Sequence, residues 1–136
     1  PGSIVMSKII PLPEVQKALI RDSFDSEGLP MPYVREIFLM QCHVAGTGFR
    51  DLKEIEPNLR PGDLLTFRRE PDNVHDRLAI EIFSESDMSL GYVPRNRNEV
   101  LARLMDSGKL VFGRVESARR IDDWLRIEIM VYMRDF

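Results

Sequence analysis

Short apolar stretches separated by turn-forming residues fill most of the chain between residues 36 and 134. Strands are predicted at residues 36–45, 64–69, 78–84, 90–93, 110–118 and 124–134. The turns between them carry proline, glycine or aspartate, as in Pro61-Gly62-Asp63. About six short strands with one helix placed late favour a small antiparallel barrel, closed or partly closed, over a parallel α/β sheet. The fold class expected is therefore mainly β (α+β).

One internal helix is expected after the fourth predicted strand. Asn96 fits its N-cap, with Glu99 three residues later as in a capping box, and the apolar residues from 100 to 105 have helical spacing. Gly108 stands where a C-terminal cap belongs. Such a helix start offers unpaired N–H groups that can receive a phosphate. Residues 119–123 are expected to form the hairpin link between the last two strands.

The first 35 residues differ from the rest and predict an N-terminal helical extension (residues 1–35), followed by the barrel domain (residues 36–136). Apolar residues recur there at helical spacing, at Val15, Ala18, Leu19 and Phe24. Pro13 suits the start of this helix and Gly28 its end. A single amphipathic helix cannot bury its own apolar face, so it must dock on the barrel or on another chain. The sequence leaves both alternatives open.

Composition excludes several classes of protein. Apolar runs such as residues 37–40 are far shorter than the roughly 20 residues that cross a bilayer, so no membrane partner is expected. Cys42 is the only cysteine, which excludes an internal disulfide and suits a reducing, intracellular (cytoplasmic) compartment. The net charge of −3, from 19 Lys and Arg against 22 Asp and Glu, excludes a broad basic surface that coats long nucleic acids by charge alone.

The sequence offers little for catalysis. Cys42 and His43 are adjacent in a predicted strand, so their side chains point to opposite faces and cannot share one metal ion. His75 and Asp76 stand together without a positioned Ser or Cys nucleophile. No glycine-rich loop of the phosphate-cradling type is present. We expect no catalytic residue, no metal and no cofactor; a nuclease or deoxynucleotide-processing enzyme using His75 and Asp76 is the weaker alternative.

Three clusters of polar, glycine and aromatic residues stand out along the chain. They are Gly-Thr-Gly-Phe-Arg at residues 46–50, Arg-Glu-Pro-Asp-Asn-Val-His-Asp at 69–76, and Gly-Tyr-Val-Pro-Arg at 91–95. With Ala79 and Ile80 they resemble the HIRAN domain, over about Phe38 to Ala118. The resemblance implies a modified OB-like β-barrel that captures the 3′-hydroxyl end of single-stranded DNA, in DNA repair or replication. The chain departs from the family's usual pattern at residues 74–75, which are usually Pro and Tyr, and at residue 78, which is usually Asn.

Four candidate binding residues can make the contacts that a strand end requires. Asp76 can accept a charge-assisted hydrogen bond from the 3′-hydroxyl. Phe49 and His75 can stack on the terminal base, which is worth about 1–3 kcal/mol per base. Asn73 can read a base edge or fix the loop. Each has a structural alternative: Asx residues in turns usually bond their own backbone, and Phe49 fits a core position.

The other candidate binding residues are three arginines and a tyrosine. Arg50, Arg69 and Arg95 can bind the DNA backbone, although Arg95 also fits a solvated surface position. Tyr92 fits the barrel core as well as it fits a contact surface. From residue 44 to residue 120 the chain has 13 Lys and Arg and 13 Asp and Glu. A neutral module cannot follow many phosphates, so DNA binding must rest on a few contacts in one pocket.

The function expected is a non-catalytic nucleic-acid-binding module that captures a single-stranded DNA end. No translocase motif is present, so a separate ATPase or helicase is the partner that would supply any motor. The alternative is a protein-interaction module that binds a peptide, or a second copy of the chain as a homodimer, through its N-terminal arm. DNA and RNA are not distinguished by the sequence.

Overall fold

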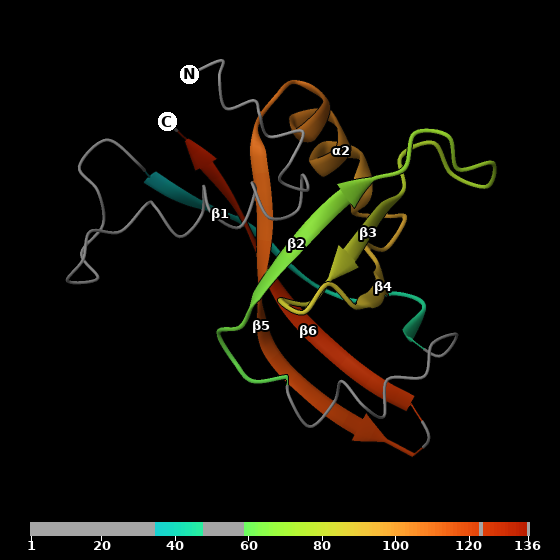
Figure 1. Cartoon of the computed structure of the whole chain (residues 1–136), viewed down its shortest axis with the longest axis vertical. Helices are drawn as coiled ribbons and strands as arrows, with labels where there is room; N and C mark the ends of the chain where they lie inside the picture. The colour runs from blue at the N-terminus through green and yellow to red at the C-terminus, as the bar shows by residue number, and fades with distance from the viewer. Residues whose placement is uncertain (1–34, 48–58, 123, 136) are drawn as a thin grey trace.

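The computed structural model describes residues 35–47, 59–122 and 124–135, and in them one antiparallel sheet and one helix dominate (Figure 1). The six strands lie in the order β1-β6-β5-β2-β3-β4. The elements are β1 (Arg35–His43), β2 (Leu64–Arg69), β3 (Ile80–Phe83), β4 (Ser89–Tyr92), α2 (Asn98–Asp106), β5 (Leu110–Ile121) and β6 (Trp124–Asp135). The mainly β fold with six strands is therefore confirmed. The predicted N-terminal extension lies outside the described residues, apart from Arg35, which begins β1.

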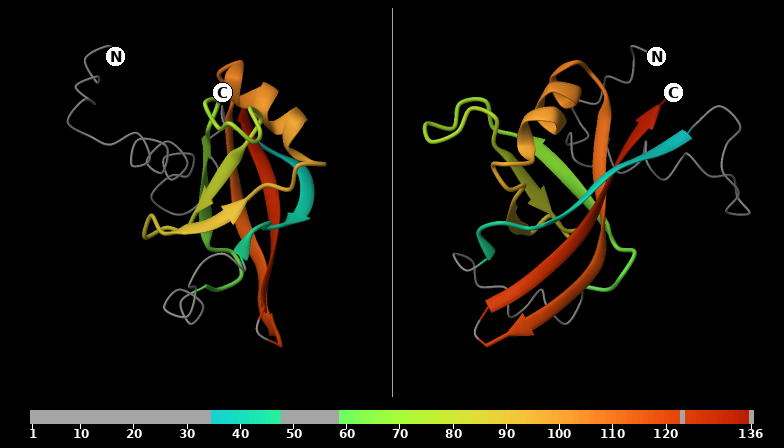
Figure 2. Two further views of the ribbon diagram at one scale, coloured as in Figure 1. Left: turned by 90° about the vertical axis from the view of Figure 1, so that its right-hand side faces the viewer. Right: turned by 180° about the vertical axis from the view of Figure 1, so that it is seen from behind.

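The sheet curls until its two edges meet, which makes a partly closed barrel (Figure 2). Ala45, just beyond β1, donates its N–H to the carbonyl of Tyr92 in β4 at 2.7 Å, and Tyr92 donates back to Ala45 at 2.8 Å. We call this pair of hydrogen bonds the closing bridge. Gly91 beside it has φ +147°, and a Cβ atom there would lie 2.2 Å from the Ala45 carbonyl oxygen. Only glycine fits so close an approach of two backbones.

The core fills the inside of the curl. In β6 every second residue from Leu125 to Val131 is buried, as the alternation in the sequence predicts. Leu101 and Ala102 of α2 belong to the same core, and the helix lies at one end of the curled sheet (Figure 2). Cys42 is buried in this core, and its burial raises the pKa of the thiol to about 11, so the thiol stays protonated at neutral pH.

Two local predictions are wrong. Residues 119–121 are not part of a loop, because Arg119 pairs with Arg126 and Ile121 with Trp124, so β5 runs on to a tight turn. Helix α2 begins at Asn98, with Arg97 at its N-cap and no side-chain cap hydrogen bond. The predicted capping box fails because Glu99 pairs with Arg103 instead, one helical turn along.

Candidate nucleic-acid interface

A pocket of about 510 Å³ opens where the closing bridge meets the loop between β2 and β3. Five of the eight candidate residues line it, with four small or apolar neighbours. The lining residues are Ala45, Gly46, Asn73, His75, Asp76, Ala79, Tyr92, Val93 and Arg95. The three sequence clusters, far apart along the chain, thus converge on one cavity. Phe49 and Arg50 of the first cluster lie outside the described residues, so their roles stay predictions.

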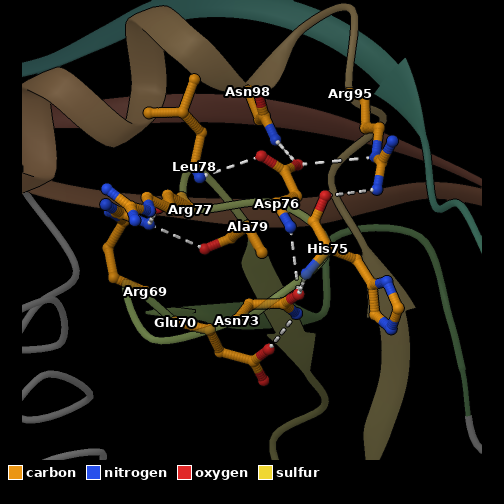
Figure 3. A network of polar contacts seen from close by, with 10 residues as sticks. All are labelled: Arg69, Glu70, Asn73, His75, Asp76, Arg77, Leu78, Ala79, Arg95 and Asn98. Atoms are coloured by element: carbon orange, nitrogen blue, oxygen red, sulfur yellow. Dashed lines mark hydrogen bonds and ion pairs between the residues drawn. The ribbon is translucent and has the colours of Figure 1, made fainter.

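Asn73 organises the loop that forms one wall of the pocket (Figure 3). Its Oδ1 accepts the backbone N–H groups of His75 at 2.8 Å and Asp76 at 3.1 Å. Its Nδ2 donates to Glu70 Oε1 at 3.0 Å. The oxygen and the nitrogen of the side-chain amide therefore both form hydrogen bonds that fix the loop. This is the structural role that the sequence predicts as the alternative to reading a base edge.

Asp76 lies at the centre of the polar network (Figure 3). Its Oδ1 accepts the backbone N–H of Leu78 at 2.9 Å, and its Oδ2 accepts Nδ2 of Asn98 at 2.8 Å. Arg95 Nε lies 3.7 Å from the same Oδ2. The side chain keeps 20% exposure, and Asp76 lines the pocket. The carboxylate is thus held in one orientation by the fold while it still faces the cavity.

Asn98 is a residue that the sequence reasoning missed. It is the first residue of α2, it is 2% exposed, and it contacts Asp76 across 22 positions of sequence. Because an asparagine in the first turn of a helix is common, nothing local to it indicates a partner in a distant loop. Its amide joins the start of the helix to the wall of the pocket.

Arg95 and His75 lie at the rim of the pocket. Arg95 Nη2 donates to the backbone carbonyl of His75 at 2.8 Å, yet the Arg95 side chain remains 71% exposed. The imidazole of His75 is exposed and points away from Asp76 in Figure 3. The rim thus carries a cation beside the carboxylate and an exposed flat ring, the groups that a phosphate and a base would contact.

Tyr92 supplies part of the opposite wall. Its hydroxyl donates to the carboxylate of Glu70, with 3.0 Å to each carboxylate oxygen. Its backbone forms the closing bridge, so the ring is held from both ends. The half-buried side chain lines the pocket and so serves the wall and the barrel together.

Arg69 does not line the pocket and is engaged by the fold. Its guanidinium forms two hydrogen bonds with the Asp106 carboxylate, at 2.9 and 3.1 Å. Its Nη1 donates to the carbonyls of Arg77 and Ala79, both at 2.9 Å. The hydrogen bond from Arg69 lowers the pKa of Asp106. These bonds tie the base of the loop to the last turn of α2.

We expect Arg69→Met to lower the free energy of unfolding by about 1–2 kcal/mol, because it removes four hydrogen bonds of a largely buried guanidinium. Urea unfolding at pH 7 measures this. Since the pKa of Asp106 is lowered in the folded state, the ion pair stabilises above the unfolded-state pKa and is lost as the pH falls through the folded-state pKa. The exposed Arg77→Met is the control, and equal effects of the two changes would contradict the structural role of Arg69.

A family model for the HIRAN domain matches residues 37–134 of the chain. The chain belongs to the HIRAN domain family. The matched range includes α2, every residue of the pocket and the six strands apart from Arg35, Glu36 and Asp135 at their ends. The three clusters that carry the resemblance are thus the ones that meet at the pocket of this HIRAN domain.

Solved structures agree with this assignment. The crystal structure of a protein from Lactobacillus plantarum has a TM-score of 0.69 and 26% identity, covering 76% of this chain and 99% of that one. The crystal structure of the HIRAN domain of human HLTF has a TM-score of 0.58 and 16% identity, covering 73% and 78%. An NMR structure of that human domain in its DNA-bound conformation has a TM-score of 0.50 and 14% identity, with the same coverage. At 16% and 14% identity, the likeness to the two human structures shows only that this chain shares their OB-like fold.

A curated relative is much longer than this chain. The Fanconi-associated nuclease 1 homolog of Arabidopsis thaliana is 33% identical over 73 residues, which is 54% of this chain and 8% of that protein.

Within residues 35–47, 59–122 and 124–135, no three or more His, Cys, Asp or Glu residues are grouped to hold a metal ion. In the same ranges no helix has the length and apolarity needed to cross a membrane.

Proposed function

We propose that this HIRAN domain binds the 3′-hydroxyl end of single-stranded DNA in the pocket, without catalysing a reaction. The observation that carries the proposal is the oriented carboxylate of Asp76, which faces a cavity with Arg95 and His75 at its rim. The DNA-bound conformation recorded for the human HLTF domain supports DNA as the class of ligand. In this proposal a separate ATPase or helicase supplies any motor activity.

The geometry supports a preference for a hydroxyl over a phosphate. A carboxylate can accept about four hydrogen bonds, and each oxygen of Asp76 accepts one from the described residues. A 3′-hydroxyl can donate to this carboxylate, whereas a 3′-phosphate would place two negative groups in contact. Arg95, mostly exposed at the rim, would meet the preceding phosphate, and His75 would stack on the terminal base.

Fluorescence anisotropy with matched oligonucleotides tests the proposal. We expect a strand ending in a 3′-hydroxyl to bind at least about tenfold more tightly than the same strand ending in a 3′-phosphate, since one charge-assisted hydrogen bond is worth about 1.5–3 kcal/mol. Equal affinities, or no binding to either strand, would contradict end capture. A matched RNA strand in the same assay distinguishes the two nucleic acids.

Salt dependence tests the size of the binding site. With two or three phosphates neutralised, log K should fall against log salt concentration with a slope of about −1.5 to −2. The same anisotropy titration at several salt concentrations measures the slope. A slope near −6 would indicate a long track of phosphates along the surface, which is not the small pocket proposed.

A further inference from the structure

A row of mainly aromatic side chains crosses the outer face of the sheet. Phe67 and Val111 point into the core, so by alternation their neighbours Thr66 and Phe112 point to the opposite face. Thr66 pairs with Phe112, and the pairing continues from strand to strand in both directions. The outer row, in its order across β3, β2, β5, β6 and β1, is Phe83, Thr66, Phe112, Tyr132 and Phe38.

The rings of the outer row are packed together. Phe112 stacks on Tyr132 with 5.6 Å between ring centroids, and Phe38 meets Tyr132 edge-on at 5.8 Å. Leu64 and Leu110 join the cluster around Phe112. So large an apolar patch on the outside of a small barrel is unfavourable in water.

The middle of the outer row is covered. Phe112 is 0% exposed and Thr66 is 3% exposed, although a single sheet with water on its outer side would leave both accessible. Arg134, on the same face, is also buried, and its guanidinium pairs with Glu36 at 2.8 Å. Phe38, at the β1 end of the row, is 54% exposed, so the burial is concentrated on β3, β2 and β5. These values belong to the isolated chain, so the covering atoms come from the chain itself.

We propose that residues 1–34 pack over the outer row, with the apolar face formed by Val15, Ala18, Leu19 and Phe24 against it. The chain enters β1 at Arg35, and the next residue, Glu36, already lies on the outer face against Arg134. The preceding segment therefore arrives beside the end of the row. The helix expected from Pro13 to Gly28 would be about 24 Å long. The row crosses five strands, a span of about 19 Å, which a helix of that length can cover.

Residues 48–58, the other segment outside the described part between β1 and β2, are less well placed. They follow Thr47, whose hydroxyl donates to the Leu125 carbonyl at 2.8 Å and accepts from Trp124 Nε1 at 3.0 Å. That contact lies where β6 begins, opposite Ile121 at the end of β5. Phe112 is nine residues back along β5, about 30 Å away. The segment returns at Leu59, which packs against the inner core and not against the cluster around Phe112. The N-terminal segment, joined to β1 beside the row, is therefore the better-placed cover.

Photocrosslinking in the full chain tests the proposal, with p-benzoylphenylalanine in place of Leu19. We expect irradiation to link position 19 to peptides that contain Thr66 or Phe112, identified by mass spectrometry. The same photoreactive residue in place of Lys17, on the polar side of the segment, is the control and should give at least fivefold less of these products. A mixture of ¹⁵N-labelled and unlabelled chains shows whether each crosslink lies within one molecule.

The outcomes separate the possible occupants of the row. Crosslinks within one chain support the proposal. Crosslinks between labelled and unlabelled chains would assign the row to a second copy, and products elsewhere or no products would also overturn the proposal. A second variant, Leu19→Lys with Phe24→Lys, should raise the fluorescence of an apolar dye such as ANS severalfold by uncovering the row. Unchanged dye fluorescence would count against the proposal.

Discussion

Asp76→Asn should lower the affinity for a strand with a free 3′-hydroxyl by about tenfold and leave affinity for the 3′-phosphate strand unchanged or higher. The asparagine keeps the size of the side chain and an oxygen for the Leu78 N–H, and the Asn98 amide can turn to accept its new partner. What is lost is the charge that strengthens the bond from the hydroxyl, about 1.4 kcal/mol. Anisotropy titrations with the two strands measure the change.

The structure offers a matched control for this change. Asp72→Asn removes the same charge from an exposed position of the same loop, outside the pocket lining, and should leave the preference for the hydroxyl intact. Asp76→Ala is a poorer test, because it strands the buried Asn98 amide and is expected to destabilise the fold by about 1–3 kcal/mol. If Asp76→Asn binds both strands as the unaltered protein does, Asp76 serves the loop alone.

Gly91→Ala is expected to be the most destabilising single substitution considered, with a loss of about 3 kcal/mol in the free energy of unfolding. The new methyl group would lie 2.2 Å from the Ala45 carbonyl oxygen and 2.7 Å from Val44 Cγ1, at a φ of +147°. The closing bridge must move to relieve that contact, which adds overpacking to backbone strain. Calorimetry should show a melting temperature lower by about 10 °C.

Gly108→Ala separates the two causes. Gly108 also has a positive φ, +96°, but a Cβ atom there meets nothing within 4 Å. The strain alone should cost about 1 kcal/mol. If Gly91→Ala lowered the free energy of unfolding no more than Gly108→Ala does, the close approach at the closing bridge would not contribute to the requirement for glycine.

The strands were predictable because their signals are local. Residues 64–69 follow a Pro-Gly-Asp turn and form β2 with the same bounds, and the alternation in residues 125–131 marks the core face of β6. The start of α2 was not predictable, because Asn98 is held by Asp76 across the fold rather than by a capping residue beside it. A local signal cannot report a partner 22 residues away.

The pocket was predictable only in part. The clusters at residues 69–76 and 91–95 do meet there, but the residue types alone could not tell Arg95 from Arg69. The first stays exposed at the rim, whereas the second is occupied by Asp106, 37 residues away. The need for glycine at residue 91 depends on Val44 and Ala45, which follow β1 at the far edge of the sheet. Such facts follow from the curl of the sheet, which no short stretch of sequence encodes.

Ala45 and Tyr92 both close the barrel and line the pocket. A substitution at the closing bridge therefore has two effects, because a change that alters ligand binding also alters the stability of the barrel. A ligand bound across the closing bridge would contact both edges of the sheet and stabilise their association. At these two positions, ligand preference and the free energy of unfolding cannot be changed independently.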